Sequence, residues 1–223
     1  MIKLQLLGYT SVDQIPHNIM NGATLPENVD AFTMVGYKRL CNIEQLMTEI
    51  KEAGIKGDVI ETGVWKGGAS IYMKYMVNKL KLNVKVYVAD SFKGLPEPTY
   101  IEDHGDVHSQ MPFLSVSKEQ VMENFKFFEL LDDNVIFLEG WFKDTLKKLK
   151  NKFSLIRLDG DMYESTMDAI KYLYPLLNKG GFVIVDDYNV VEGCFKAITK
   201  YRKDNNITSE IIFIDEASMY WKK

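Results

Sequence analysis

The chain has 223 residues, a length that fits one domain built around a single core. Hydrophobic residues make up 46% of it and charged residues 26%, as in ordinary globular proteins and unlike disordered, collagen-like or coiled-coil chains. The 27 lysines and arginines against 31 aspartates and glutamates give a net charge of −4, so no basic surplus attracts nucleic acid or an anionic membrane.

The cysteines and the apolar segments indicate where the protein works. Cys41 and Cys194 stand far apart and form neither a disulfide framework nor a CxxC pair, which favours a reducing cytoplasm. The opening apolar run is too short for a secretory signal, and no uninterrupted apolar stretch could cross a bilayer. We therefore expect a cytoplasmic protein with neither a nucleic-acid nor a membrane partner.

Residues 1–40 are expected to form a mobile N-terminal segment in front of a domain over residues 41–223. The residues that interrupt any periodicity in this segment are Pro16, Asn18, Asn21, Gly22, Pro26 and Asn28. Apolar residues then recur at helical spacing, at Leu40, Ile43, Met47 and Ile50. This spacing predicts a helix that starts near Leu40.

From Gly57 onward, short β-branched runs alternate with amphipathic stretches, which is typical of a parallel sheet covered on both faces by helices. Five core strands are predicted. The first begins at Val59, and the other four lie within residues 84–90, 134–140, 153–161 and 181–187. The sequence thus predicts an α/β fold.

Helical spacing links the predicted strands. Ile71, Met73 and Met76 lie in one helix, and a second follows a possible capping box of Ser117 and Gln120. A third apolar stripe consists of Met167, Ile170, Leu173 and Leu177, and it stops before Lys179. In the tail, residues 211–214 and 219–221 are expected to form an antiparallel hairpin at the sheet edge.

Residues 93–115 form an irregular stretch that is longer than most connections in compact domains. We interpret it as an active-site lid or a disordered segment, with a plain surface insertion as the alternative.

The residues that follow the first two strands predict a nucleoside site, because ligands of open α/β sheets bind beyond the carboxyl ends of the strands. Gly63 suits a tight turn there. Trp65 occupies the position where a dinucleotide site needs glycine, which disfavours NAD but permits a nucleoside without phosphates, such as S-adenosylmethionine. Asp90 can accept hydrogen bonds from ribose hydroxyls. Alternatively, Gly63, Gly67 and Gly68 only open a helix and Asp90 is a solvated strand end.

The third strand ends at Gly140, and Gly140 and Trp141 could flank an adenine ring. Packing of Trp141 in the core or against a helix is the simpler alternative.

The next two strands end in carboxylates, Asp159 and Asp161 on one and Asp186 and Asp187 on the other. Neighbouring strands lie about 4.8 Å apart, so these groups crowd one rim of the sheet. Such an oxygen-rich set suits Mg²⁺, and the absence of histidine or cysteine beside it disfavours zinc. The alternative is a set of polar strand ends that face water.

Two histidines lie in the long irregular stretch. His104 and His108, with Asp103 and Asp106, raise the alternative of a zinc site. Because loop histidines are more often solvated or directed towards substrate, we do not expect zinc there.

Long motifs of the chain resemble the macrocin O-methyltransferase family, whose members are Mg²⁺- and S-adenosylmethionine-dependent enzymes that methylate sugar hydroxyls. The motifs are FTMVGYKRL from Phe32, GDVIETGVWKGGAS from Gly57, VADSFKGLPEP from Val88, LLDDNVIFLEGWFKDTL from Leu130, RLDGDMYESTMDAI from Arg157 and GGFVIVDDYNVVEGC from Gly180. The resemblance implies a Rossmann-like class I methyltransferase fold. Its sheet would have seven mostly parallel strands with helices on both faces, in a methyltransferase domain over residues 41–223 behind an N-terminal lid segment over residues 1–40.

The resemblance also implies roles for individual residues. The metal ligands would be Asp159, Asp186 and Asp187, and Asp161 would be the general base. The cofactor-binding residues would be Thr33, Met34, Glu61, Gly63, Asp90 and Ser91, and we place Asp159, Gly140 and Trp141 with them. Family members also suggest a homodimer or a higher homo-oligomer.

The function expected from these residues is Mg²⁺-dependent methyl transfer from S-adenosylmethionine to a sugar hydroxyl of a glycoside or a nucleotide sugar. A catechol-like acceptor stays open, because its vicinal oxygens could chelate the same metal. An NAD-dependent sugar oxidoreductase is disfavoured by Trp65 and by the lack of a YxxxK pair after the fourth strand. A binding module without activity is disfavoured by the retained rim acids.

Overall fold

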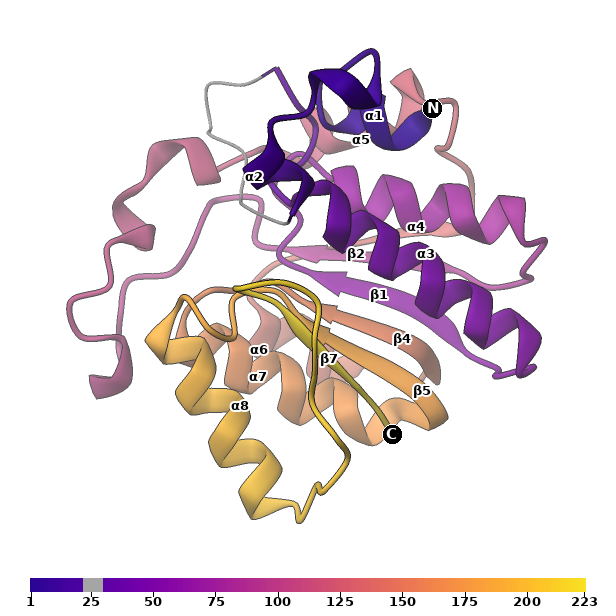
Figure 1. Ribbon diagram of the computed structural model, residues 1–223. Coiled ribbons are helices and arrows are strands. Elements are labelled where there is room, and N and C mark those ends of the chain that lie inside the picture. Colours follow the sequence, from indigo (N-terminus) through magenta and orange to yellow (C-terminus); the bar gives the residue numbers. More distant parts are fainter. Residues whose placement is uncertain (22–29) are drawn as a thin grey trace.

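In the computed structural model, residues 1–21 and 30–223 are described, and they form one seven-stranded sheet with helices on both faces (Figure 1). The strand order is β3-β2-β1-β4-β5-β7-β6; β1 to β5 are parallel, and β7 is antiparallel to both of its neighbours. The strands are β1 (Asp58–Thr62), β2 (Val86–Asp90), β3 (Val135–Glu139), β4 (Phe153–Leu158), β5 (Leu177–Val185), β6 (Ile212–Phe213) and β7 (Met219–Lys222). The predicted mostly parallel α/β sheet is confirmed.

Helices cover both faces, as expected for parallel strands that are apolar on both sides. One face carries α3 (Tyr37–Glu52), α4 (Gly68–Lys79) and α5 (Lys118–Phe127). The other carries α6 (Phe142–Thr145), α7 (Tyr163–Leu173) and α8 (Glu192–Asp204). Each layer has its own core, and adjacent residues of β4 serve different ones, since Leu155 packs in the first and Ile156 in the second. No helix in the described ranges is long and apolar enough to cross a membrane.

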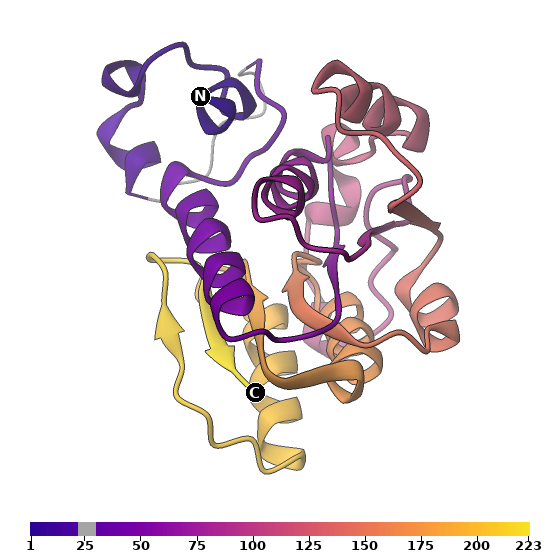
Figure 2. The same ribbon diagram turned by 90° about the vertical axis from the view of Figure 1, so that its right-hand side faces the viewer.

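The described part of the N-terminal segment is helical and packed, although its sequence shows no periodicity before Leu40. It forms α1 (Ile2–Leu6) and α2 (His17–Met20), seen beside the N-terminus in Figure 2. Leu6 and Leu7 are fully buried. Pro16 and Asn21 flank α2 as its N-cap and C-cap, so these breakers delimit a short helix and do not preclude one. Gly22, Pro26 and Asn28 lie outside the described residues.

The predicted apolar stripe that ends in Leu177 is wrong at its last member. α7 ends at Leu173, a 3₁₀ turn follows over Tyr174–Leu176, and Leu177 already pairs with Phe153 as the first residue of β5. Pro175 explains the early end, because it has no N–H to donate to the preceding turn.

Two smaller predictions are confirmed. Ser117 caps α5, since its hydroxyl accepts a hydrogen bond from the backbone N–H of Gln120 at 3.2 Å. The tail forms the expected hairpin of β6 and β7, and β7 closes onto β5 at the sheet edge (Figure 2).

Residues 93–115 contain three short 3₁₀ helices, Ile101–Asp103, His108–Gln110 and Pro112–Leu114. The segment runs beside the carboxyl ends of the strands, on the left of Figure 1.

Candidate active site

The turn after β1 brings the ends of β1 and β4 into close contact. Gly63 has φ +80°, and a Cβ there would lie 1.6 Å from the carbonyl oxygen of Asp159, so only glycine fits. Trp65 adopts a left-handed φ of 48° and donates from Nε1 to the carbonyl of Phe113 at 2.8 Å. The turn therefore sets the spacing between the two strand ends and also holds the long loop.

Asp90 at the end of β2 organises the same turn. Its carboxylate accepts hydrogen bonds from the backbone N–H of Val64 at 2.8 Å and of Phe92 at 2.7 Å. Burial raises the pKa of Asp90, although these backbone donors oppose the shift. A carboxylate has about four lone-pair sites, so Asp90 retains capacity to accept a further hydroxyl.

Two adjoining cavities of about 340 Å³ each lie at the carboxyl ends of the strands. The first is bounded by Gly63, Asp90 and Trp141, and the second by the acidic strand ends of β4 and β5. The residues that line both are Met34, Val64, Trp65, Leu114, Asp159 and Asp161. Two molecules held in these cavities would meet beside Asp159 and Asp161.

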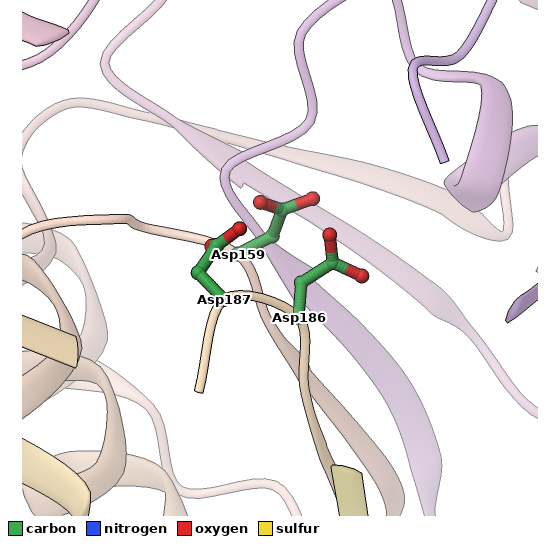
Figure 3. Close-up of side chains that lie close together, drawn as sticks. All are labelled: Asp159, Asp186 and Asp187. Atoms are coloured by element: carbon green, nitrogen blue, oxygen red, sulfur yellow. The ribbon is translucent and has the colours of Figure 1, made fainter. Parts of the chain in front are cut away.

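Three carboxylates gather at the base of the second cavity (Figure 3). Asp159, Asp186 and Asp187 each offer an oxygen, and these oxygens all lie within 4.8 Å of one another. Oδ2 of Asp187 is buried, and within the described ranges it has no hydrogen-bond partner. An unsatisfied buried carboxylate oxygen is costly, so a ligand is expected at this place.

The pKa values of these acids reflect their crowding. Burial raises the pKa of Asp187 well above its usual value, and the charges of Asp161 and Asp159 add to the shift. Burial and the charge of Asp186 raise the pKa of Asp159 to about 6. Burial and the charge of Asp159 raise the pKa of Asp161 to about 7. A divalent cation would relieve this repulsion, so the donor set fits a hard metal ion.

Asp186 differs from the others because two arginines bind it. Arg157 of β4 donates to one carboxylate oxygen, and Arg39 of α3 donates to the other at 2.7 Å. Burial alone would raise the pKa of Asp186, but the two guanidinium groups outweigh it and the pKa lies below its usual value. Asp186 is therefore ionised, and its orientation is held from two elements.

A family model described as Macrocin-O-methyltransferase (TylF) matches residues 12–223. The chain belongs to this family. The resemblance in the sequence is thereby confirmed, and the chain is an S-adenosylmethionine-dependent O-methyltransferase with the class I fold.

Individual relatives agree with this assignment. Demethyldecarbamoylnovobiocin O-methyltransferase of Streptomyces niveus is 42% identical over 208 residues, 91% of this chain and 79% of the relative. Mycinamicin III 3''-O-methyltransferase of Micromonospora griseorubida is 39% identical over 203 residues, 86% of this chain and 79% of the relative. The solved structure of the O-methyltransferase NovP superposes with a TM-score of 0.91 at 37% identity, covering 100% of this chain and 96% of that one.

The macrocin O-methyltransferase fold brings most of the predicted cofactor residues to one place. Those that line the first cavity are Met34, Gly63, Asp90, Ser91, Trp141 and Asp159. Thr33 and Glu61 line only the second cavity. The carboxylate of Glu61 accepts hydrogen bonds from the side chains of Ser70 and Arg157. Gly140 is found in the lining of neither cavity, although its backbone N–H donates to the carbonyl of Asp90 at 2.9 Å.

Sequence reasoning missed several residues of this methyltransferase site. Arg157 was signalled by its place inside an otherwise apolar strand, whereas nothing local distinguishes Arg39 on α3. Lys143 and Thr99 both bind Glu164 at the wall of the first cavity, at 3.1 Å and 2.6 Å. These contacts depend on packing between distant elements.

The loop acids beside the histidines are engaged in local contacts. Asp103 caps α7 by accepting hydrogen bonds from the backbone N–H of Tyr163 at 2.6 Å and of Glu164 at 3.1 Å. Asp106 binds His108. In the part of the chain that the structure describes, only Asp159, Asp186 and Asp187 meet the spacing of a metal site.

Proposed function

We propose that the protein transfers the methyl group of S-adenosylmethionine to a sugar hydroxyl of a glycoside, with Mg²⁺ bound by Asp159, Asp186 and Asp187 and with Asp161 as the base. The observation that carries this proposal is that Asp159 and Asp161 line both cavities. A cofactor in the first cavity and an acceptor in the second would meet at these two carboxylates. Alignment of two reactants in this way supplies a large part of the acceleration of a bimolecular reaction.

The first cavity suits the nucleoside part of the cofactor. Asp90 would accept hydrogen bonds from the ribose, and the turn at Gly63 would bring backbone close to the ligand. Met34 and Trp141 offer apolar surface to the adenine and the methionine portion. When bound, the sulfonium group supplies an electrophilic methyl group, so the protein needs only to place and activate an oxygen.

The acids at the base of the second cavity have separate roles. The metal would supply Lewis acidity and a template for neighbouring hydroxyls. Arg157 and Arg39 keep Asp186 ionised and fixed. Asp161 takes the proton from the acceptor hydroxyl, and the burial of its carboxyl group, which raises its pKa, favours its accepting a proton.

The second cavity also has an apolar wall. Its members are Met34, Val35, Met111, Phe113, Leu114, Val190 and Val191. The cationic side chains of this cavity, Arg39, Arg157 and His108, are each bound to carboxylates. A neutral glycoside with an apolar body fits this wall better than the diphosphate of a nucleotide sugar. The relatives described above are named for demethyldecarbamoylnovobiocin and mycinamicin III and not for a nucleotide sugar.

A panel of acceptors tests the proposal. The purified protein is incubated with S-adenosylmethionine and Mg²⁺ plus demethyldecarbamoylnovobiocin, mycinamicin III, a nucleotide sugar or a catechol, and products are identified by mass spectrometry. We expect methylation of a glycoside and its loss after exhaustive chelation, with recovery on adding Mg²⁺. Methylation of the catechol alone would show that the acceptor is a catechol and not a sugar. Full activity after chelation would show that the reaction does not need the metal.

Two further properties belong to the proposal. We expect self-association, which light scattering of the purified protein checks, and work in the cytoplasm, where both cysteines would stay reduced. A monodisperse monomer at micromolar concentration would contradict the first.

A further inference from the structure

One histidine of the long loop reaches the second cavity. His108 begins a 3₁₀ turn, and 30% of its side chain is exposed. It lines the cavity that also contains Asp161 and the metal-site acids, and it is not part of the lining of the first cavity. His108 is therefore placed to meet the acceptor and not the cofactor.

Asp106 holds this histidine in one orientation. One carboxylate oxygen of Asp106 accepts a hydrogen bond from the backbone N–H of His108 at 2.9 Å, and the other lies 2.6 Å from ring Nδ1. These two contacts, one to the backbone and one to the ring, fix the ring plane. Nδ1 is thereby engaged with Asp106. The Nε2 nitrogen is left for a ligand, since no partner for it is found within residues 1–21 and 30–223.

A chain of contacts ties this pair to the end of β4. The backbone N–H of Asp106 donates to the carbonyl of Asp103 at 3.0 Å. The carboxylate of Asp103, 2% exposed as a residue, accepts from the backbone N–H of Tyr163 at 2.6 Å. Tyr163 follows Asp161 by two positions. The loop that carries His108 is thus tied to the backbone just after Asp161.

The electrostatic surroundings favour a ring that donates. Burial lowers the pKa of His108, but the hydrogen bond to Asp106 and the negative charges of Asp161 and Asp106 outweigh burial, so the pKa lies above its usual value. A protonated imidazole carries N–H on both nitrogens. Its Nε2 would then present a donor to any oxygen bound in the cavity.

We propose that His108, oriented by Asp106, donates a hydrogen bond from Nε2 to an oxygen of the sugar acceptor and selects which hydroxyl lies before Asp161. This inference rests on the proposed function and adds a second contact point in the same cavity. A sugar held through two neighbouring hydroxyls could still bind in two orientations that exchange them, and a hydrogen bond from His108 would select one of the two. His108 is an acceptor-binding residue, and Asp106 is a positioning residue that acts through it.

The test compares His108→Ala and His108→Gln with His104→Ala, a matched control because His104 is an exposed histidine of the same loop. Steady-state kinetics with demethyldecarbamoylnovobiocin and with mycinamicin III give KM and kcat. Calorimetry gives the affinity for S-adenosylmethionine, thermal unfolding checks folding, and NMR identifies the methylated hydroxyl.

For His108→Ala we expect the acceptor KM to rise roughly tenfold or more, as for the loss of a hydrogen bond to a charged group, together with mixed sites of methylation. Glutamine, which retains a donor, restores part of the loss. Cofactor affinity stays within about twofold. Asp106→Asn shifts KM in the same direction by a smaller factor, because the ring loses its orienting charge, and His104→Ala changes none of these values.

An unchanged acceptor KM and an unchanged methylation site in His108→Ala would overturn the inference while the methyltransferase proposal stands. An equal loss of cofactor affinity would also overturn it, because it would assign His108 to loop stability alone. If the unmodified protein methylates neither glycoside, the proposed function fails, and this inference fails with it.

Discussion

Nη1 of Arg39 lies 2.7 Å from Oδ2 of Asp186, although the two residues are 147 positions apart in the chain. The same guanidinium donates from Nε to Asp215 at 2.7 Å, in the turn between β6 and β7. Both side chains of the Arg39–Asp186 pair are about 95% buried. One residue of α3 thus links the acidic rim to the C-terminal hairpin.

Replacing Arg39 by methionine is expected to destabilise the fold by about 3 kcal/mol or more, because it leaves buried carboxylates without their counter-ion. Lys79→Met is the control, since Lys79 is about half exposed in its pair with Glu44 and such pairs contribute about 1 kcal/mol or less. Urea unfolding of both variants measures the difference. Equal, small losses would show that Arg39 does not compensate the buried charge.

Gly63→Ala is expected to abolish cofactor binding and to reduce stability by about 2 kcal/mol or more, because the new methyl group collides with the carbonyl of Asp159 in a left-handed conformation. Gly54→Ala separates the steric collision from the cost of the left-handed backbone conformation. Gly54 has φ +65° with nothing within 4 Å, so only the conformational cost of about 1 kcal/mol remains. Calorimetric titration with S-adenosylmethionine and urea unfolding report both effects; retained binding in Gly63→Ala would show that the turn can move.

Asp161→Asn is expected to bind S-adenosylmethionine and Mn²⁺ normally while turnover falls by about 100-fold or more, since the amide cannot accept the proton. Binding by calorimetry and turnover by product formation are measured on the same preparation. Near-normal turnover would remove Asp161 from the mechanism.

The stability of the metal-free protein is expected to fall as pH rises from about 5 to about 8. The folded state holds protons on Asp159 and Asp161, with pKa values of about 6 and about 7, that the unfolded chain has already released near pH 4. That stabilisation is therefore lost as pH rises through the folded pKa values.

Calorimetric melting with and without Mg²⁺ at both pH limits measures this effect. Mg²⁺ at about 100 times its Kd stabilises by about 2.7 kcal/mol, and its effect is larger at pH 8 because protons no longer compete. An Mg²⁺ effect that is independent of pH, or that persists in Asp187→Asn, would place the ion elsewhere.

Much of the framework was predictable because it depends on local pattern and on a general property of parallel sheets. The β-branched runs predicted the core strands, and the common edge at which parallel strands end predicted that Asp159, Asp186 and Asp187 meet. The family motifs then assigned the enzyme class.

The features that the sequence did not predict depend on tertiary contacts or on a single residue that ends a helix. Arg39 lies on an ordinary amphipathic helix, and only packing shows that it reaches Asp186. The orientation of His108 follows from a loop whose conformation is held by the hydrogen bond that Asp103 accepts from Tyr163 at the start of α7. Leu177 fits a helical stripe by spacing, but Pro175 ends the helix before it.

The central claim is that the acids at the ends of β4 and β5 hold a divalent ion where the two cavities meet. Anomalous diffraction from crystals grown with Mn²⁺ and S-adenosylhomocysteine tests it most directly. We predict one strong peak within bonding distance of Asp159, Asp186 and Asp187. Cofactor density in the first cavity with no peak at these carboxylates, or with the peak at another place, would contradict the account.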